Sequence, residues 1–287
     1  MLKVGVLGTG NLGEIHLNTW KEFEQTEIAG FYEFNDSVAE QTKKTFLVNR
    51  FSDVDHLIEE CDLIGITAFA DDSFEWCQKA IRKGKHVFIE KNLANSMDEA
   101  KQLVKLIKES NVKFQVGYAE RFNPAFAALQ DLSVKPVFIE AQNIISVNHP
   151  EQKANLFFDL MISDIDIILS IVKSDVKNIS AVGTSIHPQT NDMINARIEF
   201  YNGCAVNITW AKLPVPRVHQ MRFYESGKFI DIDFINKETL AIYSVRLQLE
   251  KFRNSVLNNT TPVVSAIDGL NAMDIAHKIL QKIKHGY

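Results

Sequence analysis

Apolar positions in the first 120 residues fall into short runs, and the segments between these runs are amphipathic. The runs have the length of buried strands, while the segments repeat apolar residues at helical spacing, most clearly over 73–83 and 96–110. Ser96, with Glu99 three residues later, has the pattern of a capping box, which predicts the start of the second helix. Strands that alternate with helices predict a parallel sheet covered by helices. The strands are expected at residues 3–7, 27–32, 62–67, 86–90 and 113–117.

The pattern changes after about residue 121. A short helical pattern at 124–132 and a strand-like run at 137–147 precede an almost wholly apolar helix at 157–169. Long alternating runs follow, and they contain the steps YNGC (201–204) and ESGK (225–228), which are typical of β-hairpin turns. These runs predict an antiparallel sheet.

The chain is therefore predicted to be α/β, with two domains. The first, residues 1–120, is expected to be a doubly wound parallel sheet, and the second, residues 121–287, an α+β domain built on a mostly antiparallel sheet. The amphipathic pattern over 264–283 predicts a last helix that can pack back on the first domain.

Composition narrows the function classes. The 287 residues are 46% hydrophobic and 23% charged, with a formal net charge of -5 and no cluster of Lys and Arg, so nucleic acid and anionic membrane surfaces are poor partners. Cys61, Cys77 and Cys204 lie far apart, which predicts reduced core residues rather than metal ligands or disulfides. The chain begins with a strand pattern, and no apolar run reaches the roughly 18 residues of a membrane span, so we expect a cytoplasmic protein without a signal peptide.

A glycine motif follows the first strand. Gly8, Gly10 and Gly13 form G-x-G-x-x-G between a strand and a helix, which is the context that gives this motif its meaning. The first glycine permits a tight turn, the second lets a pyrophosphate approach the backbone, and the third lets helix and sheet pack closely. The loop, with phosphates at the helix N-terminus, is therefore predicted to bind a dinucleotide. The expected contacts are Gly8, Thr9, Gly10, Asn11, Leu12 and Gly13.

Glu33 ends the second predicted strand, twenty residues after Gly13. An acidic side chain at this position can accept hydrogen bonds from ribose hydroxyls and repel a 2′-phosphate, which favours NAD over NADP. Asn35, Lys43 and Lys44 can also approach an adenosine ribose, so NADP stays open as the less favoured cofactor.

Three further stretches, GKHVFIEKNLANSMDEAKQL (84–103), QVGYAERFNPAF (115–126) and FFDLMISDIDIIL (157–169), resemble the Gfo/Idh/MocA oxidoreductase family. The resemblance is strongest to a subgroup of short bacterial members likened to UDP-N-acetylglucosamine 3-dehydrogenases. It implies a Rossmann domain and an open-faced sheet domain, with a sugar or nucleotide sugar bound in the cleft between them. It also implies a homodimer or homotetramer formed through the open sheet.

The family motifs assign roles to particular residues. The E-K-P motif matches Glu90, Lys91 and Asn92, so the lysine that lies next to the nicotinamide is present and the proline is not. The D-x-x-x-H motif, with Asp three residues later, matches Asp159, Ser163 and Asp166. These three positions share one face of a helix, and Ser163 replaces the histidine that is the usual proton acceptor.

Other family positions also depart from the pattern. The family's T-P-T followed by His matches Thr67, Ala68, Phe69 and then Ser73, and its G-H matches Gly117 and Tyr118. Thr67, Ala68 and Glu90 are nevertheless expected on the cofactor side of the cleft. Three positions where the family has histidine therefore hold Ser73, Tyr118 and Ser163.

A sugar dehydrogenase needs a base for the hydroxyl proton, and a serine hydroxyl cannot act as that base unaided. We expect Lys91 to take this role, with Asp159 acting through Ser163 as an alternative. Tyr118, Arg121, Asn123 and Asp166 are the expected substrate contacts. Asp164, off the motif face, is expected to be structural.

Other polar residues give a weaker indication of function. His149 follows the first strand of the second domain and can reach the mouth of the cleft. Surface or sheet positions are expected for His187, His219, His277 and His285. No His, Cys or Asp cluster has the spacing of a metal site.

Three functions remain in view at this point. The first is an NAD(P)-dependent oxidoreductase that acts on a hydroxyl of a sugar or nucleotide sugar. The second is a non-catalytic protein that binds a nucleotide or sugar on the same fold, motivated by the missing histidines. The third is a reductase of a non-sugar substrate, since some family branches perform reductive chemistry without the dehydrogenase pattern.

Overall fold

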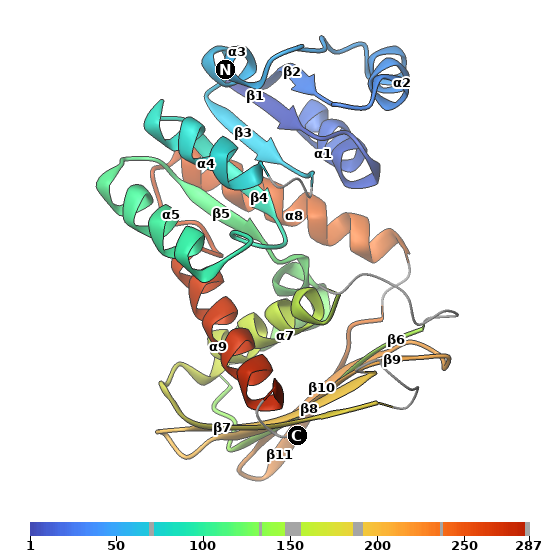
Figure 1. The fold of residues 1–287 in the computed structure, drawn as a ribbon, viewed down its shortest axis with the longest axis vertical. Coiled ribbons are helices and arrows are strands. Elements are labelled where there is room, and N and C mark those ends of the chain that lie inside the picture. The colour runs from blue at the N-terminus through green and yellow to red at the C-terminus, as the bar shows by residue number, and fades with distance from the viewer. Residues whose placement is uncertain (69–71, 132–133, 147–155, 186–191, 236–237, 285–287) are drawn as a thin grey trace. The chain divides into compact units, whose positions relative to one another are not determined.

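The computed structural model describes the chain except residues 69–71, 132–133, 147–155, 186–191, 236–237 and 285–287 (Figure 1). The chain divides into two compact units. The first unit comprises residues 1–119 and 242–270, and the second comprises residues 120–241 and 271–287.

A five-stranded parallel sheet forms the centre of the first unit, in the order β2-β1-β3-β4-β5. Its strands are β1 (Leu2–Leu7), β2 (Thr26–Tyr32), β3 (Leu63–Ile66), β4 (His86–Glu90) and β5 (Phe114–Gly117). The connecting helices are α1 (Asn11–Glu22), α2 (Asp36–Phe46), α3 (Val54–Glu60), α4 (Ser73–Arg82) and α5 (Met97–Glu109). The predicted parallel α/β domain is confirmed.

Helix α5 begins at the capping box that the sequence predicts. Ser96 is the N-cap, and its hydroxyl accepts a hydrogen bond from the Glu99 N–H at 3.2 Å. The Glu99 carboxylate accepts from the Asn95 N–H at 3.1 Å, one residue before the cap, so the predicted box closes one position early.

A helix that the sequence pattern did not predict completes the first unit. Helix α8 (Glu238–Leu257) buries Val245, Leu249 and Phe252 in a core cluster with Trp20 of α1 and Phe88 of β4. Figure 1 shows α8 behind the parallel sheet, with α4 and α5 in front of it. Residues 242–270, which the sequence pattern assigns to the second domain, therefore belong to the first unit.

The second unit contains a six-stranded sheet in the order β11-β10-β6-β9-β8-β7. Its strands are β6 (Phe138–Ser146), β7 (Val176–Thr184), β8 (Met193–Phe200), β9 (Ala205–Leu213), β10 (Val218–Glu225) and β11 (Lys228–Asp233). All neighbouring pairs are antiparallel except β6 and β9. Gly203 (φ +89°) and Gly227 (φ +80°) lie in the two predicted hairpin turns, where the left-handed backbone favours glycine.

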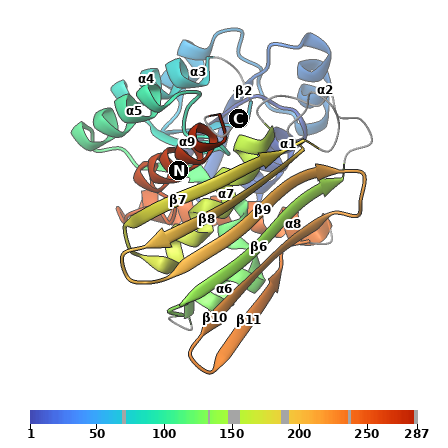
Figure 2. The same ribbon diagram turned by 60° about the horizontal axis from the view of Figure 1, so that its bottom comes forward.

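Helices cover one face of this sheet. Helix α7 (Leu156–Val172) contacts β9, and α6 (Pro124–Asp131) contacts β11. Figure 2 shows both helices behind the sheet, whose opposite face is turned to the viewer and carries no helix among the described residues. The short 3₁₀ helix η1 (Ala119–Phe122) precedes α6, and α9 (Ala266–Lys284) ends the described chain.

Candidate functional site

The glycine loop follows β1 at the carboxyl end of the parallel sheet. Gly8 has φ +89°, and a Cβ atom there would lie 2.5 Å from the Ala68 Cβ. A Cβ atom on Gly13 would lie 2.2 Å from the Gly8 carbonyl oxygen, so helix α1 can begin here only with glycine at position 13. The Thr67 hydroxyl donates a hydrogen bond to the same carbonyl oxygen at 2.7 Å. Thr67 and Ala68, both predicted to lie at the cofactor, therefore brace this loop.

Gly10 differs from the other two glycines. A Cβ atom there would have no atom within 4 Å, so the fold itself does not require glycine at this position. Gly10 is the N-cap of α1, and it makes no side-chain capping hydrogen bond. Helix α1 begins at Asn11, and the first N–H groups of a helix, which have no partner within the helix, suit a pyrophosphate.

Glu33 lies beside this loop and is 6% exposed. Its carboxylate accepts hydrogen bonds from the Thr9 N–H at 2.8 Å and the Asn35 N–H at 3.0 Å. Arg50 donates to the Glu33 carbonyl oxygen at 2.8 Å and pairs with Asp36. An acid is therefore fixed at the end of β2 next to the loop, and together with the open space at Gly10 it fits a bound dinucleotide.

Lys91 follows β4 and is exposed. Its φ of +66° is unusual for a residue other than glycine. Its N–H donates to the Gly117 carbonyl oxygen at 3.2 Å. The preceding Glu90 is buried, and its carboxylate contacts His16 and Gln248 in the interior of the first unit. The predicted contact of Glu90 with a cofactor stays a prediction.

Two other predicted residues of the first unit have their own surroundings. Tyr118 is 2% exposed, and its hydroxyl lies 3.6 Å from the point where a Cβ on Gly269 would stand. The Ser73 hydroxyl donates to the Ala68 carbonyl oxygen at 3.3 Å. Phe69, the third motif position on this side, lies outside the described residues.

Helix α7 of the second unit carries the motif face. Asp159 and Ser163 are half-buried, and the Ser163 hydroxyl donates to the Leu160 carbonyl oxygen at 3.4 Å. Asp166 forms a two-point ion pair with Arg121 of η1, at 2.6 Å to Nε and 2.8 Å to Nη2, and both side chains are buried.

Asn123 is 3% exposed, and its side-chain oxygen accepts from the Ala125 N–H at 2.9 Å at the start of α6. Asn123 thus caps α6, while Arg121 is fixed by Asp166. Their predicted contacts with a substrate stay predictions.

Asp164 explains a second acidic position on this apolar helix. It is fully buried and accepts hydrogen bonds from Asn143 and Trp210, both at 2.8 Å, and lies 2.7 Å from His219 Nε2. Asn143 pairs with both Trp210 and His219 across β6, β9 and β10, so the three groups form one row of the sheet. The structural role expected for Asp164 agrees with this geometry.

His219 lies on β10 and is 3% exposed. Burial by itself lowers the pKa of His219, but the adjacent Asp164 carboxylate outweighs it, so the pKa is raised. The expected surface or sheet position is therefore a buried sheet position. The sequence offered one signal for this partner, namely an aspartate in a nearly continuous apolar helix, which needs a buried counter-group.

Four other histidines had a predicted position. His277 lies on α9, where its ring is 4.8 Å from that of Phe158. His149, His187 and His285 lie outside the described residues. Within the part of the chain that the structure describes, no group of three or more His, Cys, Asp or Glu side chains can hold a metal ion.

The three cysteines are free and buried. Burial raises the pKa of Cys61 to about 12 and that of Cys204 to about 11, and it raises the pKa of Cys77 as well. These thiols match the predicted reduced core residues.

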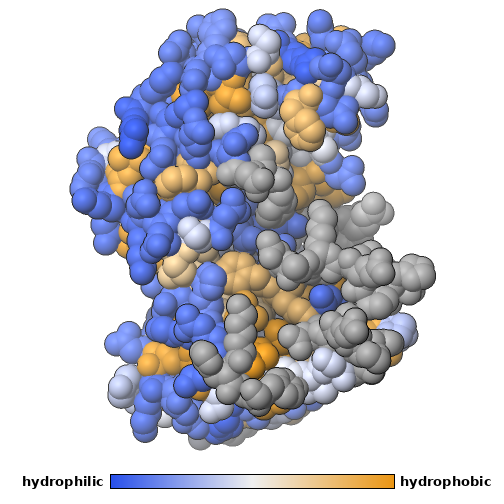
Figure 3. All heavy atoms as spheres, in the orientation of Figure 1, coloured by the Kyte–Doolittle hydropathy of each residue, from blue (hydrophilic) through white to orange (hydrophobic). Residues whose placement is uncertain are grey.

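The surface of the first unit is largely polar. The face of the first unit seen in Figure 3 is mostly hydrophilic, with small separate apolar patches. Among the described helices, none combines the length and apolar character that crossing a membrane requires.

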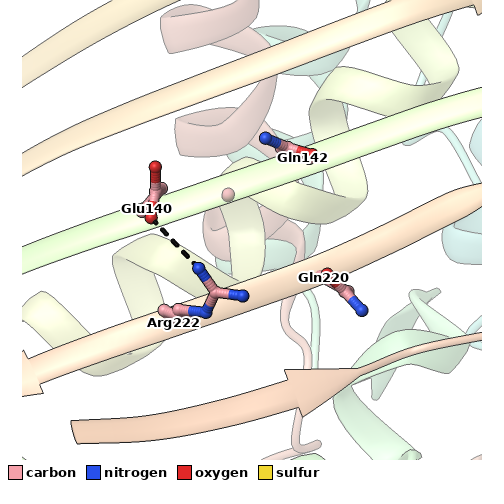
Figure 4. Close-up of a pocket in the computed structure, with 5 residues that line it drawn as sticks. Glu140, Gln142, Gln220 and Arg222 are labelled. Atoms are coloured by element: carbon pink, nitrogen blue, oxygen red, sulfur yellow. Dashed lines mark ion pairs between the residues drawn. The ribbon is translucent and has the colours of Figure 1, made fainter.

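One hollow lies on the open face of the second sheet (Figure 4). It is lined by Glu140 and Gln142 of β6 and by Gln220 and Arg222 of β10, and Arg222 pairs with Glu140 at 3.6 Å. Its volume of about 40 Å³ is far below that of typical ligand pockets, so it is no candidate for a sugar site.

Part of the first unit matches a known protein family. Residues 2–118 match the family GFO_IDH_MocA, described as an oxidoreductase family with an NAD-binding Rossmann fold. This segment matches the Rossmann domain of the Gfo/Idh/MocA oxidoreductase family. The resemblance to the family that the sequence motifs indicated is confirmed for this segment.

The chain is also similar to curated proteins that are named as dehydrogenases of a nucleotide sugar or an inositol. The UDP-N-acetylglucosamine 3-dehydrogenase of Acidithiobacillus ferrooxidans is 26% identical over 84% of this chain and 77% of its own length. The scyllo-inositol 2-dehydrogenase (NAD(+)) of Bacillus subtilis is 24% identical over 99% of this chain and 95% of its own length.

Solved structures show the same fold over the whole chain. The Acidithiobacillus ferrooxidans enzyme superposes with a TM-score of 0.90 at 20% identity, covering 99% of this chain and 98% of that one. The scyllo-inositol dehydrogenase of Lactobacillus casei, solved with NAD(H) and scyllo-inositol, gives 0.87 at 19% identity, covering 99% and 97%. These similarities confirm the predicted fold of both units.

Proposed function

We propose that this protein is an NAD-dependent oxidoreductase that oxidises a ring hydroxyl of a sugar or nucleotide sugar to a ketone. The observation that carries the proposal is the placement of Lys91. It lies in a left-handed turn after β4, at the same carboxyl edge of the parallel sheet as the glycine loop after β1. Ligands of open α/β sheets bind along this edge.

The nicotinamide cofactor would supply the hydride acceptor for this reaction. The glycine loop from Gly8 to Gly13 would hold its diphosphate, and Thr67 and Ala68 would keep that loop in shape. Lys91 takes the hydroxyl proton of the substrate, and Tyr118 donates a hydrogen bond to the substrate oxygen.

On the second unit, we assign substrate contacts to Asn123 and to the Arg121–Asp166 pair. The pair fixes the guanidinium group in one orientation, which suits recognition of an anionic substituent such as a diphosphate. Asp159, acting through Ser163, is the alternative route for the proton.

We propose NAD rather than NADP because of Glu33. Its buried carboxylate lies beside the loop, where it can accept hydrogen bonds from ribose hydroxyls and would repel a 2′-phosphate. Replacing Glu33 is expected to narrow the preference between the two cofactors.

One observation favours a second candidate, a member that binds nucleotide and sugar without turnover. Ser163 stands where the family has its proton acceptor, and its hydroxyl donates to a carbonyl oxygen of its own helix. A hydroxyl used in this way is no base for a sugar alcohol. The two candidates therefore differ in whether Lys91 can serve instead.

The deciding experiment follows nicotinamide absorbance with NAD and a panel of UDP-sugars, free sugars and inositols. Wild type is compared with Lys91→Ala, Ser163→His and the control Lys105→Ala, whose side chain is 78% exposed on α5. We expect wild-type turnover, loss of about 10²- to 10⁴-fold in Lys91→Ala, as is usual for a proton-transfer group, and no change in the control.

Other outcomes separate the alternatives. A silent wild type with an active Ser163→His variant would favour the non-catalytic candidate. Full turnover by Lys91→Ala, or no binding of NAD(H), would refute the proposed function.

We further propose that the protein forms a homodimer or homotetramer through the open face of the second sheet. Tyr224, Phe138 and Phe229 form an aromatic cluster there, with ring centroids 5.8 and 6.2 Å apart. Phe229 is 65% exposed, so part of the cluster lies on the surface, and exposed apolar patches mark protein contact sites.

A further inference from the structure

A chain of polar side chains crosses the interior of the first unit. His16 of α1, Glu90 of β4, Gln115 of β5 and Gln248 of α8 are each at most 6% exposed. His16 Nε2 lies 2.7 Å from Glu90 Oε1, and the Gln248 amide donates to the same oxygen at 3.0 Å. The Gln115 amide donates to the Gln248 carbonyl oxygen at 3.2 Å. Four elements of the unit thus meet at one buried carboxylate and its neighbours.

Part of this network has no hydrogen-bond partner. Among the described residues, His16 Nδ1, Trp20 Nε1, Gln115 Oε1 and Gln248 Oε1 are buried without one. Buried polar groups are costly when they are only partly satisfied, and an apolar core would avoid that cost. Each of these groups therefore calls for an explanation, and the geometry around Glu90 offers one.

The orientation of His16 follows from its neighbours. A carboxylate only accepts hydrogen bonds, so the nitrogen of His16 that faces Glu90 carries the hydrogen, and in the neutral ring Nδ1 is an acceptor. Trp20, one turn later on α1, presents an N–H donor nearby. A Cβ atom on Gly65 would lie 3.5 Å from His16 Nδ1 and 3.9 Å from Trp20 Nε1. The surroundings thus suit a His16 that donates to Glu90.

The contacts of Glu90 also reach the turn at Lys91. The second carboxylate oxygen of Glu90 lies against Gly117, where a Cβ atom would stand 2.6 Å from it. The carbonyl oxygen of Gly117 in turn accepts from the Lys91 N–H at 3.2 Å. The side chain before the turn and the backbone of the turn are therefore fixed against the same residue.

The turn needs such support because Lys91 has φ +66°. A left-handed conformation in a residue other than glycine persists only where the surrounding structure imposes it, and it clusters at functional sites. We propose that His16 and Gln248 are positioning residues, which hold Glu90 so that the left-handed turn presents the Lys91 amine to the substrate. This inference rests on the proposed function, in which Lys91 takes the substrate proton.

The proposal also assigns a functional role to α8. Gln248 lies 158 positions after Glu90 in the chain and belongs to the segment that returns to the first unit from the second. Helix α8 would thus complete the surroundings of the catalytic lysine as well as the core.

The test compares Gln248→Met with Gln115→Met in the full-length protein. Both replace a fully buried glutamine of the same network by a side chain of similar size, but only Gln248 contacts the Glu90 carboxylate. We expect Gln248→Met to lower kcat about tenfold or more, because misplacing a catalytic group by about 1 Å costs up to about 10²-fold. The Kd for NAD should stay within about twofold, and Gln115→Met should keep its kcat.

A double-mutant cycle distinguishes positioning from general damage. In the Lys91→Ala background, Gln248→Met should cause no further loss of kcat, since the group that it positions is gone. If Gln248→Met folds poorly, a second pair of variants, His16→Gln and His16→Leu, tests the same contact. His16→Gln keeps an N–H donor and should retain more kcat than His16→Leu. Equal losses in Gln248→Met and Gln115→Met, or a full additive loss in the Lys91→Ala background, would overturn the proposal.

A readout without turnover separates this proposal from the proposed function. Acetylation of Lys91 by a limiting amount of acetylating reagent, measured by mass spectrometry against the other lysines, reports its environment directly. Gln248→Met should change the Lys91 rate several-fold and leave other lysines and Gln115→Met unchanged. If no substrate is turned over but this change occurs, the proposed function fails and the positioning stands. An unchanged Lys91 rate would refute the positioning itself.

Discussion

The three glycines of the nucleotide loop have different physical reasons for being glycine. Gly13 is required by the protein, since a Cβ atom there would lie 2.2 Å from the Gly8 carbonyl oxygen. Gly10 has open space where its Cβ would be, so its requirement would come from a ligand. The loop therefore separates the needs of the fold from those of the cofactor at single positions.

This difference predicts two distinct variants. Gly10→Ala should keep the wild-type Tm within about 1–2 °C, because surface changes away from contacts cost little, yet bind NADH at least tenfold more weakly, as measured by nicotinamide fluorescence. Gly13→Ala should lose both NADH binding and several degrees of Tm, because backbone must shift to admit the methyl group. Unchanged NADH affinity in Gly10→Ala would contradict the assignment of this loop to the diphosphate.

At the residue scale, sequence spacing predicted the local part of the site and missed the remote part. Gly8 to Gly13 and Glu33 could be named because their chemistry follows from a strand, a turn and a fixed spacing. The contact between His16 and Glu90 spans 74 positions, and no local rule pairs a helix histidine with a strand glutamate. Gln248 could not be found for the same reason.

At the scale of elements, α7 owes its position to one buried acid. Asp164 binds three side chains of one row of the sheet, Asn143, Trp210 and His219, and so fixes the helix against β6, β9 and β10. Its neighbour Asp166 ties the same helix to η1 through Arg121. These aspartates are paired, which is why an otherwise apolar buried helix can carry them.

The Asp164–His219 pair predicts a pH-dependent stability. Burial lowers the pKa of His219, but the Asp164 carboxylate raises it above the unfolded value of about 6.5. Glu120 adds a smaller increase, and Arg217 a smaller decrease. The contribution of the pair to the free energy of unfolding is therefore fully present below about pH 6.5 and is lost as the pH rises through the folded-state pKa.

His219→Phe should accordingly lose about 3–5 kcal/mol near pH 5.5, the usual cost of removing one partner of a buried ion pair, and less near pH 9. Phenylalanine suits the site because His219 stacks on Phe234, with ring centroids 4.8 Å apart. Urea unfolding at the two pH values measures the difference. A loss that does not vary with pH would show that the pair is not charged at acid pH.

Helix α8 shows what a pattern can and cannot supply. Its buried residues Val245, Leu249 and Phe252 have helical spacing, although we predicted no helix over this segment. Its place was not predictable from sequence, because the chain leaves the first unit near residue 119 and returns at 242. Which core an amphipathic helix covers depends on contacts that no window of sequence contains.

At the scale of the whole molecule, the open face of the second sheet is the proposed site of assembly. The face combines the Tyr224–Phe138–Phe229 cluster with paired charges, Arg222 with Asp231 at 2.9 Å and with Glu140 at 3.6 Å. An apolar patch rimmed by polar groups is typical of a surface that binds another protein. A second copy of the chain is the proposed partner, since most soluble oligomers are symmetric homo-oligomers.

Phe229→Glu tests this assembly because it places a charge in the aromatic cluster without touching the helix-covered face. We expect wild type to be a dimer or tetramer by light scattering coupled to size exclusion, and the variant to shift to monomer at micromolar concentration. The control is Tyr201→Glu, which changes an aromatic residue that is 71% exposed in the β8–β9 turn and should leave the mass unchanged. A monomeric wild type would refute the assembly. A variant that stays oligomeric would show that the partner binds elsewhere, since a buried unpaired carboxylate in the contact would cost more than an interface of ordinary size can tolerate.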